Sequence, residues 1–446
     1  MTVVLASSLV VALTLACLWP AMNRLGIVAP VLCAMSLRLF FGFSTHFGVL
    51  GSPTSDTRTY DRLALDVSTA WESDITPPGL IAGKEGWVIV LASIYRVIGH
   101  APEVGIALNA GVGAATVLIT AATSQTLGWG SSRRVAAWCM ALWPVGVFWG
   151  PQLLREAIVT FLVALAVLGI ALIGARRTLV GTLLLMLSGS AMIWMRGGLA
   201  YFILVVMPTT YAVARLLIRS GDRRRWQTVL PTMLLLTGVL TAGLELLSSG
   251  YTFSVDRIQA ATSLANTGST SFSAAGVPTE NDALALVNVA VGPLPFSWRN
   301  FGLLIAGLDG VLWATLWIFA VWGYRASSVN RWAPVTFLSS LVALLAFLSL
   351  TTANFGTIMR YRSVGVPLLI PVAAVGLHWW LTRNKLPADP LPSRPATPHS
   401  IDPLSSKCCA DDGPTQTQAI GASSRRPDTT DLSSGTDQDL STRRVE

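Results

Sequence analysis

An acidic, tyrosine-containing stretch lies between apolar segments near the start of the chain, in residues 55–64. A carboxylate can take the proton of a hydroxyl group or hold a divalent metal ion. On a helix that begins near Ser55, Asp56 and Tyr60 share a face, whereas Asp61 points about 140° away from Asp56. We therefore expect Asp56 to carry the chemistry, with Tyr60 and Asp61 as supporting residues. The alternative is that Asp56 simply caps the start of the helix.

A second set of charged residues flanks later apolar segments. Guanidinium groups pair bidentately with phosphate, which favours a lipid-phosphate substrate. The residues expected to bind this phosphate are Lys84, Arg155, Arg196, Arg360 and Arg362, with Glu156 as a second catalytic acid and Glu85 and Tyr361 as supporting residues. A divalent cation, Mg²⁺ or Mn²⁺, is possible between Asp56 and Glu156. The alternative for each arginine is an anchor at the membrane surface, and Arg155 with Glu156 can also be a local ion pair.

Membrane-spanning helices must position these residues. Of the 446 residues, 52% are hydrophobic and only 12% are charged, and the mean hydropathy is +0.58. Apolar runs approach the ~18–20 residues that cross a bilayer, which predicts an all-α, polytopic membrane protein with one integral domain over residues 1–382. About eleven spans are expected, at 3–19, 24–44, 103–123, 134–150, 154–174, 178–195, 199–218, 228–247, 302–323, 333–352 and 363–382.

The basic residues predict how these spans are oriented. Pairs such as Arg133 with Arg134 and Arg176 with Arg177 fall in alternate connections, and the positive-inside rule places these in the cytoplasm. The opposite connections, including long loops at 45–102 and 248–301, then face outward with the candidate site. The apolar segment 86–98 is too short to cross, so we expect an amphipathic helix on the outer surface. The polar tail, 383–446, is expected to be disordered and cytoplasmic.

Several other features carry less chemistry. The net charge of +8 comes from short basic clusters between apolar runs, so nucleic acid is not an expected partner. The five cysteines suggest no disulfide framework, and the four histidines lack the spacing of a metal site. Asp309, an acid within an apolar span, is a secondary candidate without a named role.

The order of the short motifs resembles that of the GT-C superfamily, the multi-pass glycosyltransferases that use polyprenyl-phosphate sugars and include protein O-mannosyltransferases and lipid A aminoarabinose transferases. The motifs are Asp56 to Tyr60 with Ala64, Gly83-Lys84-Glu85-Gly86 before a short helix that ends in Tyr95-Arg96-Val97-Ile98-Gly99, Trp143-Pro144 before Leu154-Arg155-Glu156-Ala157, and Arg360-Tyr361-Arg362 before Pro367. In element order the resemblance covers most of residues 35–380.

The resemblance implies particular roles. Asp56 would activate or orient the acceptor, Lys84 would contact the donor phosphate, and Glu156 would be the acid that opens a later span. The chain departs from the family where Glu85 and Gly86 replace the prolines of a Lys-Pro-Pro-Leu-like element, and where Glu156 stands in place of the aspartate of many relatives.

The expected function is therefore the transfer of a sugar from a polyprenyl-phosphate donor to a lipid, glycan or protein acceptor at the outer face of the cytoplasmic membrane. Two alternatives stay open. A transporter or flippase for a lipid-linked glycan would place its charges near the membrane midplane and often shows repeated halves. A polymerase or ligase of surface polysaccharide would use similar arginines together with a large late outer loop, for which 248–301 is a candidate.

Overall fold

The computed structural model describes residues 2–50, 55–77, 85–219, 301–327, 330–351 and 355–383. Within these ranges the regular structure is helical throughout and contains no strand, which confirms the all-α class. The helices are α1 (Thr2–Leu25), α2 (Val28–His46), α3 (Ser55–Glu72), α4 (Glu85–Ile98), α5 (Pro102–Thr126), η1 (Gly130–Ser132), α6 (Arg133–Ala141), α7 (Pro144–Phe148), α8 (Glu156–Gly174), α9 (Thr178–Tyr201), η2 (Phe202–Val206), α10 (Met207–Arg219), α14 (Phe301–Ala326), α15 (Trp332–Thr351) and α16 (Phe355–Arg383).

Seven stretches of the described chain are long and apolar enough to cross a membrane, which indicates a membrane-embedded protein. They are α1, α2, α5, α8, Thr178–Ile218, Leu304–Ala326 and Arg362–Arg383. The predicted span at 228–247, the loop at 248–301 and the tail from residue 384 lie outside the described residues. The total of eleven spans therefore stays a prediction.

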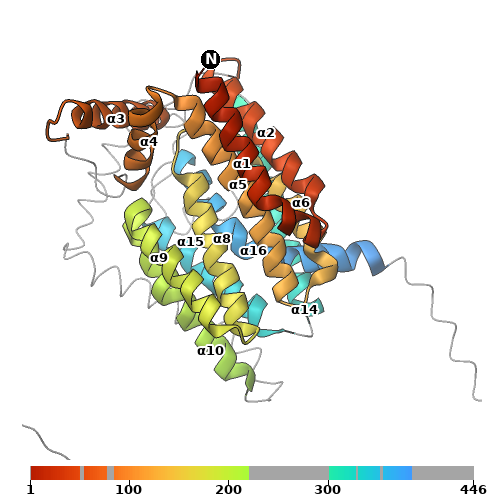
Figure 1. Ribbon diagram of the computed structural model, residues 1–446. Helices are drawn as coiled ribbons and strands as arrows, with labels where there is room; N and C mark the ends of the chain where they lie inside the picture. Colours follow the sequence, from red (N-terminus) through yellow and green to blue (C-terminus); the bar gives the residue numbers. More distant parts are fainter. Residues whose placement is uncertain are drawn as a thin grey trace, which may run out of the picture. The chain divides into compact units, whose positions relative to one another are not determined.

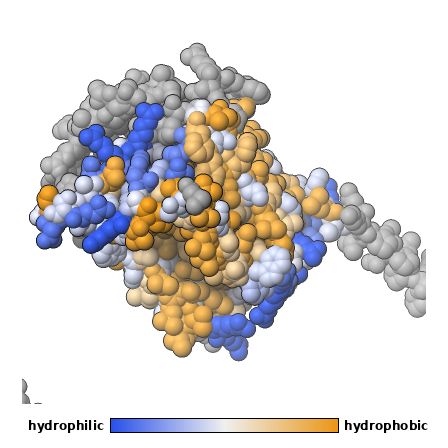
Figure 2. All heavy atoms as spheres, turned by 45° about the horizontal axis from the view of Figure 1, so that its top comes forward, coloured by the Kyte–Doolittle hydropathy of each residue, from blue (hydrophilic) through white to orange (hydrophobic). Residues whose placement is uncertain are grey.

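The surface of the bundle is apolar where lipid would contact it. On α1, the side chains of Leu5, Leu9 and Leu13 are 62%, 58% and 56% exposed. Such a row is disfavoured in water and matches hydrocarbon. Figure 2 shows apolar residues over much of the visible face, with hydrophilic residues gathered on the side of α3 and at the opposite lower edge.

Hydrogen bonds between helix connections show that the connections with basic residues lie together at one end of the bundle. The Nε of Arg133 donates a hydrogen bond of 2.8 Å to the carbonyl of Leu25. The amide of Asn330 donates one of 2.7 Å to the carbonyl of Leu127. The connections around residues 25, 127 and 330, all predicted to be cytoplasmic, therefore lie together.

A second group of connections meets at the other ends of these helices. Arg360 contacts the carboxylates of both Asp56 and Glu156, and His46 lies 3.5 Å from Glu103. These connections are the ones predicted to face outward. Which side of the membrane each end faces stays a prediction.

The predicted span at 134–150 is not one helix. It consists of the 9-residue α6 and the 5-residue α7, separated at Leu142 and Trp143. Pro144 explains the break, because a proline inside a helix removes a hydrogen bond and clashes with the preceding turn. The residue before it is pushed to an extended conformation, and Trp143 has φ −62° and ψ 117°.

The chain reverses within the stretch 178–218. Arg196 has an extended backbone, with φ −165° and ψ 81°, between helical neighbours. A side chain on Gly189 would overlap Leu204, so these two residues touch. In an unbroken helix they would be about 22 Å apart. The turn therefore lies at Arg196, inside the connection 195–198 that the sequence predicts.

Helices α3 and α4 pack against each other beside the bundle (Figure 1). Helix α4 matches the predicted short helix at 86–98, and it buries Trp87, Leu91 and Tyr95. The side chains of Tyr60, Ala64 and Val67 are buried on α3. This packing holds the N-terminal end of α3, with Asp56, in a defined place.

Candidate functional site

The first turn of α3 brings Asp56 to the site. The hydroxyl of Thr57, the next residue, donates a hydrogen bond of 3.3 Å to Oε1 of Gln152, which lies in the connection before α8. Tyr60, one turn later, is only 3% exposed. The side chain of Asp56 itself is 40% exposed. Asp56 is therefore held by its neighbours and still open to an incoming molecule.

Glu156 is the first residue of α8, where a carboxylate is stabilised by the helix dipole. The connection before it is held by Asn109 of α5, whose amide donates hydrogen bonds of 2.5 Å and 2.9 Å to the carbonyls of Gln152 and Leu154. The side chain of Glu156 is 10% exposed. Its Oε2 is buried and accepts no hydrogen bond from the described residues.

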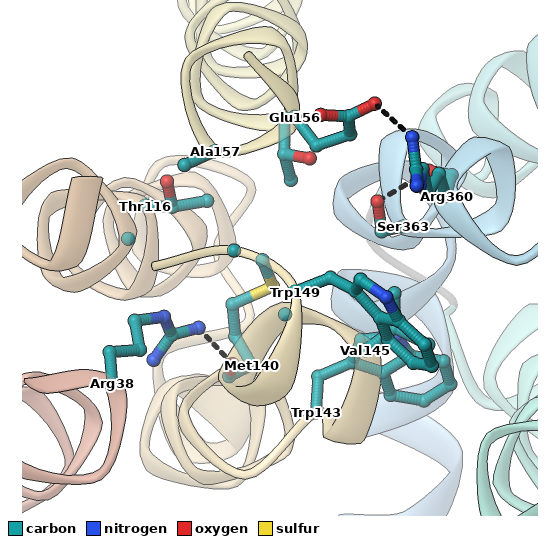
Figure 3. A pocket seen from close by; sticks show the side chains of 14 residues that line it. Arg38, Thr116, Met140, Trp143, Val145, Trp149, Glu156, Ala157, Arg360 and Ser363 are labelled. Carbon is teal, nitrogen blue, oxygen red and sulfur yellow. Dashed lines mark hydrogen bonds and ion pairs between the residues drawn. The ribbon is translucent and has the colours of Figure 1, made fainter. Parts of the chain in front are cut away.

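Arg360 of α16 joins the two acids. Its Nη1 donates a hydrogen bond to Oδ2 of Asp56 and lies 3.9 Å from Oε1 of Glu156. Figure 3 shows Arg360 and Glu156 facing each other across the site. Three segments that are far apart in the sequence thus meet on one guanidinium group.

Two further arginines lie around Tyr60. Nη1 of Arg155 donates a hydrogen bond of 3.0 Å to the carbonyl of Met195, next to Arg196. Burial raises the pKa of Tyr60 to about 12, and four charges act on the same hydroxyl: those of Arg155 and Arg196 lower its pKa, whereas those of Glu156 and Asp56 raise it. The phenol thus lies within reach of all four predicted site residues and stays neutral at physiological pH.

The structure places other predicted residues elsewhere. Arg362 pairs with Asp309 at 3.8 Å, with both side chains fully buried. Asp61 accepts a hydrogen bond of 2.6 Å from Tyr95 and lies 3.0 Å from Nε2 of His100. The first pair joins α16 to α14, and the contact of Asp61 with Tyr95 joins α3 to α4.

The remaining predicted residues are Lys84 of the phosphate-binding set and the supporting residues Glu85 and Tyr361. Glu85 is half-buried at the start of α4, and the neighbouring Gly86 packs on the main chain of Trp194, because an added Cβ there would lie 2.7 Å from its carbonyl oxygen. Lys84 and the side chain of Tyr361 lie outside the part of the chain that is described.

A pocket runs from these groups into the bundle, and the space between its lining atoms, open solvent included, is about 440 Å³. Glu156 and Arg360 line one part of it, and Arg38 of α2 lines another, as Figure 3 shows. The indole rings of Trp143 and Trp149 form apolar walls. The sequence reasoning missed Arg38, although an arginine inside the apolar run 24–44 is itself a signal of function.

A metal ion between the two acids stays a prediction. Asp56 and Glu156 share Arg360, so the guanidinium group already neutralises part of their charge. The described residues contain no group of three His, Cys, Asp or Glu side chains with the geometry of a metal site. A cation at this place would rely on two carboxylates and on oxygens of a substrate.

Comparison with known protein families, with curated proteins and with solved structures finds no match to this chain.

Proposed function

We propose that this protein is a membrane glycosyltransferase of the GT-C type, which moves a sugar from a polyprenyl-phosphate carrier to an acceptor at the outer face of the cytoplasmic membrane. The observation that carries the proposal is the meeting of Asp56 and Glu156 at Arg360, beside a pocket between apolar helices that Glu156 and Arg360 line. The acceptor is a lipid, a glycan or a protein.

In this reaction Asp56 acts as the general base. It takes the proton of the acceptor hydroxyl, and the hydroxyl oxygen then forms a bond to the anomeric carbon of the sugar. The bond between that carbon and the phosphate oxygen breaks, and the phosphate leaves with the bonding electrons. The exposed fraction of Asp56, 40%, leaves room for an acceptor. A positioned base of this kind contributes about 10²–10⁴ in rate.

Arginines stabilise the charge that develops on the departing phosphate. Arg155 and Arg196 lie close enough to Tyr60 to change its pKa. Arg360 adds a third guanidinium group, which contacts Asp56 and Glu156. One guanidinium group can donate hydrogen bonds to two phosphate oxygens at once, so it can stabilise a negative charge that is spread over several oxygens. Glu156 holds Arg360 in place and balances part of its charge.

A lipid-linked glycan flippase is the second candidate function. It is favoured by the charged residues within the apolar helices, namely Arg38 on α2 and the buried pair of Arg362 with Asp309. Such intramembrane charges often mark transport pathways. A flippase would move the intact lipid-linked sugar between leaflets, whereas a transferase would release the lipid carrier from its sugar.

The test is Asp56→Asn in purified protein reconstituted into liposomes with a labelled pool of polyprenyl-phosphate sugars. We expect release of the lipid phosphate to fall by about two orders of magnitude or more. The matched control is Asp66→Asn, on the same helix and partly exposed. Undiminished release in Asp56→Asn would remove Asp56 from the mechanism. Movement of intact donor between leaflets, without release, would favour the flippase.

A further inference from the structure

Arg38 is a buried cation inside the apolar helix α2. Its side chain is 2% exposed and donates hydrogen bonds to three main-chain carbonyls. The distances are 3.2 Å to Ala34, 3.4 Å to Ala141 and 3.4 Å to Met140. Each is longer than the usual distance of about 2.9 Å for such a bond. Arg38 is therefore held, but weakly.

The charge of Arg38 is compensated only in part. Ala141 and Met140 end α6, so their carbonyls carry the negative end of a helix dipole. No described aspartate or glutamate forms an ion pair with Arg38. A full positive charge among apolar helices is costly unless another negative group joins it. The site therefore attracts an anion more strongly than its surroundings do.

Residues without side chains form the pocket wall beside Arg38. Gly113 and Gly146 flank the guanidinium group, and a side chain at Gly113 would overlap its Nε. The indole N–H of Trp143 is buried in the same lining and has no acceptor among the described residues. Arg38 and Trp143 both lie near Gly146 in the lining, and Figure 3 shows Arg38 in a different part of the pocket from Glu156 and Arg360.

We propose that the Arg38 end of this pocket binds an oxyanion of the substrate, with Arg38 as the specificity-determining residue and Trp143 as a second donor. This inference rests on the proposed function, because it assigns the ligand to the sugar-lipid substrate. Two sources supply the same chemistry: a phosphate of the lipid carrier, or a carboxylate on the sugar itself. A charge-assisted hydrogen bond between a guanidinium group and either oxyanion is shorter and stronger than the carbonyl contacts that Arg38 makes now.

The experiment measures binding without turnover, so its result does not depend on catalysis. Four probes are titrated into the detergent-purified full chain: a polyprenyl phosphate, the corresponding polyprenol, glucuronate and glucose. We expect one anionic probe to bind at least about tenfold more tightly than its neutral counterpart. A preference for the phosphate identifies the carrier as the source, and a preference for glucuronate identifies the sugar.

Variants then assign the preference to Arg38. Arg38→Gln is expected to reduce the preference at least several-fold, and Arg38→Lys to reduce it less. Gly113→Ala keeps the charge but crowds Nε, and it should weaken binding of the anion more than that of the neutral probe. The matched control is Arg133→Gln, since Arg133 also donates to main-chain carbonyls but does not line the pocket.

The outcomes separate this proposal from the proposed function. Equal binding of charged and neutral probes by the wild type, or an unchanged preference in Arg38→Gln and Gly113→Ala, would overturn the role of Arg38. If Arg38→Gln does not fold, Arg38→Lys and Gly113→Ala decide. If Asp56→Asn loses transfer but keeps the anion preference, both the anion subsite at Arg38 and the transferase function are supported. If the wild type shows the anion preference but has no transferase activity, the subsite is supported and the transferase function is excluded.

Discussion

Arg362 and Asp309 form an ion pair in which both side chains are fully buried, with Nη1 3.8 Å from Oδ2. The two residues join α16 to α14. The pair gives the intramembrane acid a partner, while a contact of Arg362 with phosphate stays a prediction. At this distance the charges attract each other without a direct hydrogen bond, and the pair links two helices that pack closely.

Breaking this pair should destabilise the protein more than replacing it. Asp309→Asn leaves the charge of Arg362 uncompensated in the bundle, and Arg362→Met leaves the carboxyl group of Asp309 without its partner. For Asp309→Asn we expect the free energy of unfolding to fall by about 3–5 kcal/mol. The double variant Asp309→Leu with Arg362→Met should lose less. Thermal unfolding of the detergent-purified protein measures both effects, and a double variant less stable than either single one would contradict the prediction.

Arg360 should be hard to replace even by another cation. A lysine ammonium group cannot reach Asp56 and Glu156 with the planar geometry of a guanidinium group. We expect Arg360→Lys to lower the rate of sugar transfer by about 10²-fold, the size of a lost charge-stabilising contact. Arg58→Lys, at an exposed arginine of α3, the helix that carries Asp56, is the control. Wild-type rates in Arg360→Lys would exclude the bridging role.

The contact of Asp61 with Tyr95 should position α3. Because Tyr95 of α4 donates the hydrogen bond of 2.6 Å, Tyr95→Phe removes it while keeping the packing of the ring. We expect faster hydrogen exchange in residues 55–72 and a several-fold lower transfer rate, with a stability loss of about 1–2 kcal/mol. Thr69→Ala, which removes an exposed hydroxyl bonded within α3, is the control. Exchange equal to the wild type would show that the bond is not needed.

Tyr60 should make the protein sensitive to alkaline pH. Burial raises the pKa of Tyr60 from 10.0 to about 12. The neutral phenol is thus favoured in the folded state, and this contribution of roughly 2–3 kcal/mol is complete below pH 10 and is lost between about pH 10 and 12. Unfolding midpoints measured across this range should fall less steeply for Tyr60→Phe than for the wild type. Parallel curves would contradict the assignment.

Much of the fold follows from hydropathy, because each apolar run is long enough to form a helix on its own. The ends of α5, α8 and α14 fall within a few residues of the predicted spans. The break between α6 and α7 was missed, since the run 134–150 is apolar throughout and Pro144 was read as part of a span. A proline in the middle of an apolar run was the available signal.

The site was predictable in part for a different reason. Alternating basic connections imply that the remaining helix ends lie together, and Asp56, Glu156 and Arg360 do meet there. Spacing along the chain does not show which way a side chain turns, so the turn of Arg362 toward Asp309 could not be read from its closeness to Arg360. Arg38 lies inside the apolar run 24–44, away from the connections whose charges predict the site.

The interruption at Trp143 and Pro144 has a consequence for how deep a polar ligand can travel. Lipid tails cannot form hydrogen bonds with the backbone carbonyls that a break in a membrane helix leaves without a helical partner. Such breaks therefore lie inside the protein or line a water-filled cavity. Here the oxygens that end α6, a helix only about 14 Å long, include those of Met140 and Ala141, which accept hydrogen bonds from Arg38. The break between α6 and α7 therefore provides polar backbone groups inside the bundle, at a depth where an unbroken helix would present only apolar side chains.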